Sequence, residues 1–426
     1  MRYRIVAETY ESLERTSKRL EMTSILVTLL KQTSIKNIDK VIYLTQGKLK
    51  PEYEGIELGI SDKLALKTIH VTSGKSITEL ENDYKKLGDI GKVAEIASKS
   101  KPQSTLFSEL LTVERLYETL EKISNITGSK SVETKIRYLS NIITDSNPIE
   151  AKYIMRTVVG KLRLGIADQT VLDALAEAFT EDKKNKKELE DAYNITSDLG
   201  KIANIVASNG LNAIKELKLK VGNPIRPMLA ERLSSANEII EKIGECSVEY
   251  KLDGERLQIH KSNNETNIYS RRLENITIQY PDVIKIVNKQ IRAKEVIIEA
   301  EVVAINSKTK KYLPFQQLMH RRRKHGIENA IKQYPISLNF FDVLYHDSKE
   351  IMNEPYSNRR KLLEEIIDVD ETVKVVPLKI SDDPKEIEEF MEKAIEDGCE
   401  GLVAKKLSSK YRAGARGYSW IKLKRD

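Results

Sequence analysis

The chain has 426 residues, of which 40% are hydrophobic, so it is long enough for about three domains and can fill more than one core. The formal net charge of +7 is a moderate basic excess, which permits a nucleic-acid partner without requiring one. The two cysteines, Cys246 and Cys399, are too few for a disulfide framework or a four-cysteine zinc module, and they predict a reduced interior. Neither a signal peptide nor a membrane span is recognised, so a cytoplasmic location is expected.

The first half of the chain is predicted to be mostly helical. Four hydrophobic residues recur at helical spacing and would form one buried face. They are Ile136, Leu139, Ile142 and Ile143. Asn147 followed by Pro148 predicts the start of the next helix, because asparagine caps helix N-termini and proline fits the first helical position. Further helices are expected at residues 10–31, 77–86 and 169–179.

The pattern changes at residues 221–227, where Gly222, Pro224 and Pro227 end the helical periodicity. We therefore expect a helical domain at 1–215 and a second domain at 216–426. Short alternating runs rich in Val, Ile, Tyr and Phe predict strands at 247–252, 256–261, 296–305, 336–345, 373–378 and 401–406. Helices expected at 282–292, 359–367 and 385–396 make the second domain α+β, with largely antiparallel sheets.

Residues 251–256 read K-x-D-G-x-R and follow one of the predicted strands. A free lysine has a pKa of about 10.4 and is protonated at neutral pH, so it cannot attack a phosphorus centre. Partial burial and a neighbouring positive charge such as Arg256 would favour the neutral, nucleophilic amine of Lys251. Taken alone, the hexad is also typical of an exposed hairpin turn with a solvated lysine.

Five further segments follow the hexad in a fixed order. They are 269–272 (YSRR), 298–303 (IEAEVV), 340–345 (FFDVLY), 400–405 (EGLVAK) and 420–424 (WIKLK). The ordered set resembles the nucleotidyltransferase motifs of the ATP-dependent DNA ligases and, more loosely, those of RNA ligases and mRNA capping enzymes. The resemblance implies an adenylation domain that acts in DNA replication, repair and recombination.

The resemblance also assigns roles to the motif residues. Lys251 would form a phosphoamide with AMP, and Lys422 and Lys424, which alternate on one strand face, would hold the α-phosphate. Phe341 would stack on the adenine, and Glu249 would accept a hydrogen bond from its amino group. Considered without the motif order, the two lysines would instead predict a solvated basic strand, and Phe341 a core residue.

Glu301 and Glu400 are the expected ligands of a divalent cation, Mg²⁺ or Mn²⁺. Magnesium commonly takes only one or two carboxylates together with phosphates and waters, so two acidic residues suffice. By resemblance Glu301 also lies near the ribose hydroxyls. Glu299 shares its strand face and stays an alternative, since the family usually has D-G-E or E-G-E where this chain has Glu299-Ala300-Glu301.

Several cations are expected to contact DNA. Arg256 and Arg271 resemble family arginines that contact AMP and the 5′-phosphate of a nick, which suits the bidentate geometry of guanidinium on phosphate. The cluster Arg321, Arg322 and Arg323 fits phosphate-backbone contact, although a solvated helix face explains it equally well.

The helical half carries its own resemblance. Residues 47–51 (GKLKP), 57–60 (ELGI) and 161–166 (KLRLGI) look like the amino-terminal DNA-binding domain of archaeal and eukaryotic replicative ligases. In that family the domain encircles and bends nicked duplex, mostly through backbone contacts. Lys161 and Arg163 are therefore expected to contact DNA, and the alternative is a pair of exposed helix-end cations.

The family carries an OB-fold domain after the W-x-K-x-K motif, whereas this sequence ends two residues after Lys424. The resemblance thus predicts a shortened ligase in which reaction with ATP is slow and nick sealing is weak. ATP is expected as the co-substrate, because NAD-dependent ligases add a cysteine zinc module that two cysteines cannot supply.

The expected function is DNA ligation in three steps: self-adenylation of Lys251, transfer of AMP to the 5′-phosphate of a nick, and sealing by the 3′-hydroxyl. The expected partners are ATP and nicked double-stranded DNA, while a sliding-clamp partner is not derivable from the sequence. Two alternatives are an RNA-joining or capping enzyme and a fragment that binds nicks without efficient catalysis.

Overall fold

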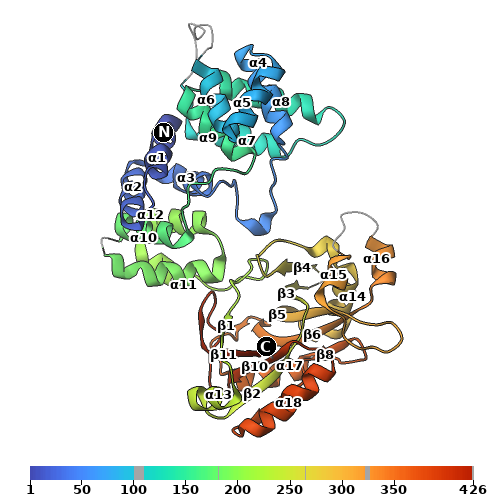
Figure 1. Ribbon diagram of the computed structural model, residues 1–426. Coiled ribbons are helices and arrows are strands. Elements are labelled where there is room, and N and C mark those ends of the chain that lie inside the picture. Colours follow the sequence, from blue (N-terminus) through green and yellow to red (C-terminus); the bar gives the residue numbers. More distant parts are fainter. Residues whose placement is uncertain (100–109, 181, 264, 322–326, 425–426) are drawn as a thin grey trace. The chain divides into compact units, whose positions relative to one another are not determined.

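The computed structural model describes residues 1–99, 110–180, 182–263, 265–321 and 327–424. The chain forms two compact units, which are drawn in Figure 1. The first comprises Met1–Tyr193 and Asp198–Leu217, and the second comprises Asn194–Ser197 and Lys218–Asp426. The chain therefore passes into the second unit at Leu217-Lys218, near the end of the last long helix of the first half.

The first unit is built from helices around one apolar core. Its α-helices are α1 (Tyr3–Glu14), α2 (Arg19–Gln32), α3 (Ile38–Thr45), α4 (Asp62–Ser73), α5 (Ile77–Leu87), α6 (Ile90–Lys99), α7 (Val113–Ser124), α8 (Ser131–Asp145), α9 (Pro148–Val158), α10 (Asp168–Phe179), α11 (Lys186–Thr196), whose last residues belong to the second unit, and α12 (Leu199–Lys215). Short 3-10 turns lie at Ile35–Asn37, Glu52–Glu54 and Lys183–Asn185. On α8, Leu139, Ile142 and Ile143 are buried as predicted.

The start of α9 confirms the cap expected at Asn147. The Asn147 side chain accepts a hydrogen bond from the Glu150 backbone N–H (2.9 Å), and the Glu150 carboxylate accepts one from the Asn147 N–H (2.8 Å). Pro148 occupies the first helical position, where no backbone N–H is needed. The reciprocal bonds satisfy two amide groups that the helix itself leaves unpaired.

The single helix predicted at residues 10–31 is wrong, because the chain breaks between α1 and α2. The Lys18 backbone N–H donates to the Thr16 hydroxyl (3.1 Å), and that hydroxyl in turn donates to the Glu21 carboxylate (2.5 Å). Threonine and serine side chains offer the backbone such local partners, which compete with helical hydrogen bonds. The apolar periodicity on either side had concealed this break.

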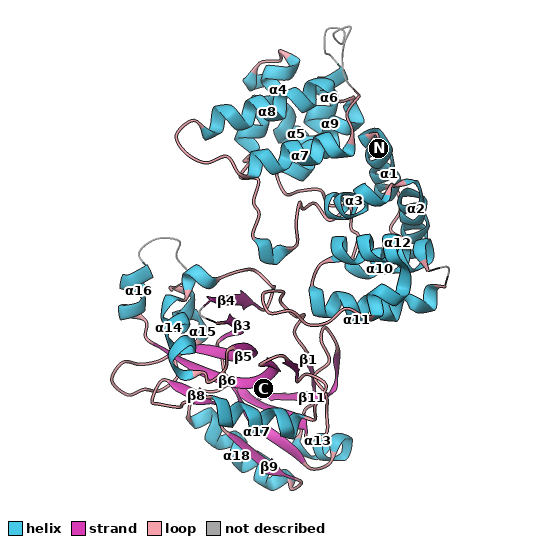
Figure 2. Cartoon of the chain, turned by 180° about the vertical axis from the view of Figure 1, so that it is seen from behind, coloured by secondary structure: helices cyan, strands magenta, loops and turns pink. Residues whose placement is uncertain are grey.

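The second unit contains two sheets, whose strands are magenta in Figure 2. The five-stranded sheet has the order β1 (Leu229–Arg232), β11 (Arg416–Lys424), β10 (Gly401–Lys406), β2 (Cys246–Lys251), β9 (Leu378–Ser381). The six-stranded sheet has the order β4 (Glu265–Ser270), β3 (Glu255–Ser262), β5 (Glu295–Ala304), β6 (Ile336–His346), β7 (Lys349–Glu350), and β8 (Val373–Val375) pairs with β6. Only β1–β11 and β6–β8 are parallel pairs among the described strands, so the sheets are largely antiparallel, as predicted.

Helices cover the two sheets of the second unit (Figures 1 and 2). Helices α13 (Ala236–Ile243) and α18 (Pro384–Glu396) share a core with the five-stranded sheet. Helices α14 (Pro281–Gln290) and α17 (Tyr356–Ile366) share a core with the six-stranded sheet, and α15 (Phe315–Met319) and α16 (Ile327–Gln333) follow β5. A 3-10 turn lies at Thr277–Gln279. A bidentate ion pair between Arg359 of α17 and Asp342 of β6 (2.8 and 3.0 Å) is fully buried and joins this helix to the sheet.

The single strand predicted at 373–378 is also wrong, because the chain changes sheets there. Strand β8 lies in one sheet and β9 in the other, joined only by Val376 and Pro377. Val376 donates its N–H to the Phe340 carbonyl (2.9 Å), whereas the Pro377 carbonyl accepts from the Tyr250 N–H (3.2 Å). Proline has no N–H with which to continue a strand ladder, so the crossover falls at Pro377.

None of the helices in the described part of the chain combines the length and apolar character that a bilayer crossing requires.

Candidate active site

A cavity of about 380 Å³ lies between the two sheets of the second unit, and we call it the central pocket. The five-stranded sheet contributes Glu249, Lys251, Val403, Lys405, Arg416, Trp420, Lys422 and Lys424. The six-stranded sheet contributes Arg256, Glu301 and Phe341. Glu400, Arg271 and the segment Met228, Leu229, Ala230 complete much of the lining. The motif segments, which are far apart in sequence, thus converge on one cavity.

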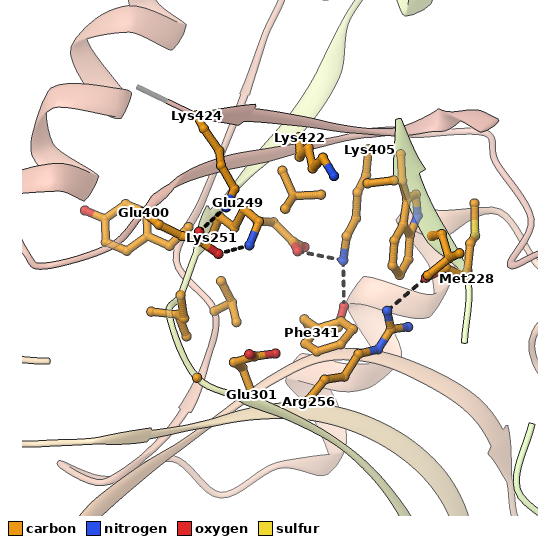
Figure 3. Close-up of a pocket in the computed structure, with 18 of the residues that line it drawn as sticks. Met228, Glu249, Lys251, Arg256, Glu301, Phe341, Glu400, Lys405, Lys422 and Lys424 are labelled. Atoms are coloured by element: carbon orange, nitrogen blue, oxygen red, sulfur yellow. Dashed lines mark hydrogen bonds and ion pairs between the residues drawn. The ribbon is translucent and has the colours of Figure 1, made fainter. Parts of the chain in front are cut away.

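At one end of the central pocket two lysines share one carboxylate (Figure 3). Glu400 accepts a hydrogen bond from Lys251 on one oxygen and from Lys424 on the other. The strand register explains the arrangement, because Gly401, the residue after Glu400, pairs with both Lys251 and Lys424. Although burial raises the pKa of Glu400, the bonds from the two lysines outweigh it and lower that pKa.

Gly401 is required where β10 begins. Its φ is +149°, and a Cβ at this position would meet the Leu423 carbonyl oxygen at 2.1 Å. The close approach of β10 to β11 brings Glu400 and Lys424 within bonding reach. A side chain at position 401 would separate these strands and open this end of the pocket.

Positive charge is concentrated around Lys422, which lies on β11 between Trp420 and Lys424. Burial lowers the pKa of the Lys422 amine, and Arg416, Lys251, Lys424 and Arg232 lower it further. Lysines and arginines crowded in this way favour binding of a polyanion, because its charge relieves their mutual repulsion.

Arg256 has a different partner from the one expected. Its guanidinium binds Glu299 through Nη2–Oε2 (2.7 Å) and Nε–Oε1 (3.3 Å), and Nη1 donates to the Met228 carbonyl (2.8 Å; Figure 3). Although burial opposes the charged form, Glu299 raises the pKa of Arg256. The Lys251 amine is instead bonded to the Glu400 carboxylate, and the charge of Arg256 is balanced by Glu299.

The two glutamates of β5 have distinct environments. Glu299 is completely buried against Arg256, whereas Glu301 lines the central pocket. Burial raises the pKa of Glu301 to about 7, with partial offset from Lys251 and Arg256. Gly254 lets the turn after β2 approach β5, since a Cβ there would lie 2.3 Å from the Val302 carbonyl oxygen. Glu301, rather than Glu299, is thus the carboxylate that faces the cavity.

Glu301 and Glu400 suit a hard divalent cation. Glu400 is near enough to Glu301 to raise its pKa, so the two carboxylates face the same part of the central pocket. No group of three or more His, Cys, Asp or Glu able to hold a metal ion occurs among the described residues. A pair of carboxylates suits a divalent cation that also binds phosphate and water.

The other end of the pocket contains aromatic side chains and a buried ion pair between Glu249 and Lys405. The Glu249 carboxylate accepts hydrogen bonds from Tyr356 and from Lys405 Nζ (2.6 Å). Phe341 is half-buried, with the Arg256 guanidinium 5.2 Å from its ring centroid and the Lys405 amine 5.0 Å from it. An ionised carboxylate has about four acceptor sites, so Glu249 can still accept a bond from a ligand.

Comparison with known proteins identifies the family. The family models described as "DNA ligase N terminus" and "ATP dependent DNA ligase domain" match residues 2–176 and 227–424. The DNA ligase of Nitrosopumilus maritimus (strain SCM1) is 47% identical over 427 residues, covering 100% of this chain and 73% of the relative. The chain belongs to the ATP-dependent DNA ligase family. Members of this family use ATP and typically a divalent metal ion. The two matching family models also confirm the predicted fold class, a helical domain followed by an adenylation domain.

Other relatives of the ligase agree. DNA ligase 2 of Thermofilum pendens (strain DSM 2475 / Hrk 5) is 48% identical over 436 residues, covering 100% of this chain and 72% of the relative. The solved structure "Pmar-Lig_Pre." matches 99% of the ligase and 78% of its own chain, with a TM-score of 0.51 and 18% identity. That structure supports the fold alone.

Several residues of the central pocket carried no predicted role, among them two cations, Lys405 and Arg416. Lys405 is fully buried in the ligase, where its amine binds Glu249, donates to the Phe341 carbonyl (3.1 Å) and lies 4.4 Å from the Trp420 ring centroid. Burial lowers the pKa of Lys405, and Glu249 opposes that effect. The sequence signal that could have placed Lys405 in the pocket was strand alternation, because Lys405 lies on the same face of β10 as Val403. Arg416 begins β11 and had no comparable signal.

The expected DNA-contact residues of the ligase have unequal exposure. Lys161 forms an ion pair with Asp62 (2.8 Å) that raises its pKa, while Arg163 is exposed and has a φ of +49°. Arg271 is exposed at the rim of the central pocket. Arg163 and Arg271 are thus the two that stand open to solvent.

The basic cluster differs from expectation at its first residue. Arg321 is buried, with 1% of its side chain exposed, and it pairs with Asp282 and lies 5.6 Å from the Tyr280 ring centroid. Its burial corrects the expectation of a surface contact, because a DNA phosphate cannot reach it without displacing this packing. Arg322 and Arg323 lie outside the described residues.

Proposed function

We propose that Lys251 is the residue of this ligase that carries AMP. Its nitrogen forms a bond to the α-phosphorus of ATP while the bond from that phosphorus to the β-phosphate oxygen breaks, and pyrophosphate leaves. An oxygen of the 5′-phosphate at a nick then takes the AMP from the lysine. Attack by the 3′-hydroxyl finally seals the strand and releases AMP.

The charge around Lys251 supports this chemistry. Lys422 and Lys424 lie on the same strand face, so both can bind non-bridging oxygens of the α-phosphate. Glu400 holds Lys251 and Lys424 in the resting pocket, so both amines must leave this carboxylate before they can act on ATP. A triphosphate that takes over the bonds to Lys424 and Lys422 would leave Lys251 beside the α-phosphorus.

Glu301 and Glu400 are the proposed ligands of a divalent cation, Mg²⁺ or Mn²⁺. Such a cation would offset the negative charge of the triphosphate. The carboxylate of Glu301 must be ionised to bind a cation. Because its pKa is raised to about 7, its ionisation is sensitive to nearby positive charge. Glu301 also lies opposite Arg256 in the β3–β5 register, which fits a position beside the ribose.

Adenine is proposed to bind at the aromatic end, against Phe341 and with its amino group on Glu249. Phe341 offers a half-buried ring, and Glu249 is held in place by Tyr356, Arg360 and Lys405. A carboxylate fixed in this way accepts from an amino group but repels a carbonyl oxygen. This favours ATP over GTP.

Nicked duplex DNA is the proposed second substrate, with Arg271 on the 5′-phosphate and Arg256 beside the AMP. In the helical domain, exposed Arg163 and Lys161 are the proposed contacts to the duplex backbone. Arg322 and Arg323 stay predicted contacts. A guanidinium on a phosphate provides two parallel hydrogen bonds, which lysine cannot reproduce.

A single observation carries the proposal: the Lys251 amine lies in one cavity with Glu301, Phe341, Glu400 and Lys422. The test is mass spectrometry after incubation with ATP and magnesium, which should detect an adduct of about 329 Da, the mass of an AMP residue joined by a phosphoamide. The adduct should map to Lys251 and be absent from Lys251→Ala.

Lys406→Ala is the matched control, because Lys406 is exposed at the far end of β10 and lies outside the central pocket. It should be adenylated like the wild type. An adduct that persists in Lys251→Ala would refute the assignment. Comparing nicked duplex DNA with RNA ends as acceptors then tests the proposed second substrate.

A further inference from the structure

The segment that leads into β1, residues 222–228, has neither helix nor strand structure, and we call it the strap. Prolines at positions 224 and 227 remove two N–H groups and restrict the backbone to extended conformations. Ile225 is completely buried, so the polar groups of the strap need partners within the protein.

Three alternating residues of β3 supply many of those partners. His260 Nδ1 accepts from the Gly222 N–H (2.9 Å), and Gln258 binds both the N–H (2.6 Å) and the carbonyl (2.9 Å) of Ile225. Arg256 then donates to the Met228 carbonyl (2.8 Å). Residues that alternate on a strand point to one face, so β3 presents a ladder of side chains to every third residue of the strap.

Further backbone groups of the strap are bound by residues outside β3. The Pro224 carbonyl accepts from the Ser197 hydroxyl (2.6 Å), and the Arg226 N–H donates to the Asn194 carbonyl (2.8 Å). The Arg226 carbonyl accepts from the Gly414 N–H (2.9 Å). An irregular segment held by this many hydrogen bonds is strongly restrained to one conformation.

The hydrogen bonds of the ladder are mutually consistent. Because His260 Nδ1 accepts, the proton is on Nε2, which donates to Gln258 Oε1 (3.0 Å). The same Gln258 oxygen accepts from Ile225, and its amide nitrogen donates to the Ile225 carbonyl. Burial lowers the pKa of His260 to about 3, so the ring stays neutral and keeps this tautomer. The amide nitrogen also donates to Glu299 (3.4 Å), so reversing the Gln258 amide would break four bonds together.

The strap ends at the central pocket. Met228, Leu229 and Ala230 line that cavity directly after the last rung of the ladder. Met228 is also fixed by its N–H, which donates to the Tyr411 hydroxyl (2.9 Å). A shift of the strap would therefore move one wall of the pocket while leaving Lys251, Glu301 and Glu400 in place.

We propose that Gln258 and His260 are positioning residues for ATP binding: by holding the strap they fix the wall formed by Met228, Leu229 and Ala230. This rests on the proposal that ATP binds in the central pocket. Neither side chain lines the pocket, so each acts through the groups it binds, which are the backbone of the strap and, for Gln258, also the Glu299 carboxylate (3.4 Å). The role predicts a weaker affinity for ATP with an unchanged rate of adenylyl transfer once ATP is bound.

The test uses Gln258→Leu, which keeps the approximate volume of the side chain and removes both bonds to Ile225, together with the bonds to His260 and Glu299. The dissociation constant for α,β-methylene-ATP, whose P–C bond prevents AMP transfer, is measured by equilibrium dialysis. We expect it to rise about tenfold. The KM of self-adenylation for ATP should rise in parallel, with kcat within about twofold of the wild type.

The control is Ile259→Val, on the opposite face of β3 in the core of the six-stranded sheet. It lowers stability without touching the strap, and it should leave the dissociation constant unchanged. Unchanged affinity in Gln258→Leu, or an equal loss of affinity in Ile259→Val, would overturn the proposal, because affinity would then be independent of the strap or would simply follow stability.

A pair of His260 variants decides the matter if Gln258→Leu does not fold. Asparagine can place an acceptor oxygen near the position of Nδ1, whereas phenylalanine fills the space without an acceptor. His260→Asn should therefore bind the analogue more tightly than His260→Phe, and equal affinities would sink the proposal. If the wild type binds the analogue but no AMP forms on Lys251, the proposed function fails while the inference stands. A wild type that does not bind the analogue refutes both.

Discussion

The two ends of the central pocket are built in opposite ways. At the phosphate end, the side chains of Lys251, Glu400 and Lys424 are 23%, 27% and 35% exposed, and their ion pairs can be exchanged for bonds to a ligand. At the adenine end, Lys405 and Glu249 are 2% and 3% exposed and are held by several partners. Under the proposed function, the groups that take part in bond making are thus kept replaceable, while the groups that recognise the base are fixed in advance.

The largest effect is expected at the phosphate end, for Lys251→Ala. Adenylation should fall by on the order of 10⁴-fold or more, because Lys251 is the amine proposed to form the phosphoamide. Thermal unfolding should change little, since a partly exposed ion pair contributes less than about 1 kcal/mol. Labelled ATP and a melting curve measure the two quantities. A large loss of stability would show that the two ends do not differ as described.

At the adenine end the expected effect is on stability. Lys405→Met leaves the Glu249 carboxylate buried without its lysine, and breaking a buried pair in this way costs about 3 kcal/mol. Urea unfolding should show this loss as a lower midpoint with an unchanged slope. Lys424→Met, at the phosphate end, should cost less than about 1 kcal/mol. Equal losses would erase the contrast between the ends.

The buried ladder on β3 predicts a pH dependence. Burial lowers the pKa of His260 to about 3 in the folded protein, against about 6.5 in the unfolded chain. Between these values the unfolded state binds the extra proton, so stability falls as the pH decreases below about 6.5. The contribution amounts to about 1.5 kcal/mol between pH 6.5 and pH 5.

His260→Asn removes this titration, so its stability should vary less over the same pH range. Urea unfolding at several pH values compares the two proteins. A wild type and a variant with parallel pH profiles would mean that His260 becomes protonated within the fold.

The smallest effect is expected for an exposed cation of the helical domain. Arg163→Ala should weaken binding to nicked duplex DNA by about 1 kcal/mol and reduce the slope of log K against log salt by about one. Arg4→Ala removes another exposed arginine, one paired with Glu8 on α1, and it should leave the slope unchanged. Fluorescence anisotropy at several salt concentrations measures both. The same slope for both variants would exclude a specific contact at Arg163.

Much of this arrangement could be predicted from the sequence. The order of the motifs anticipated that Lys251, Glu301, Phe341, Glu400 and Lys422 would meet, and each of these residues lies on a strand or directly beside one. The periodicity of the helical half anticipated its buried faces. These are local features that the chain encodes within a few residues.

Features set by long-range packing could not be predicted. The bond between Lys251 and Glu400, in place of a close approach by Arg256, depends on the register of β2 against β10. The burial of Lys405 and Arg321 depends on which element covers each side chain, and their charge had suggested solvent. The change of sheet at Pro377 was hidden within a run that is apolar enough for one strand.

That change of sheet limits how the molecule can move. Val376 lines the central pocket, and three peptide units from Val375 to Leu378 join its opposing walls. They can span at most about 11 Å. The two walls therefore stay close together where this short connection joins them. Any widening that admits a bulky substrate must therefore occur away from this connection. The distance between the walls at the connection itself changes little.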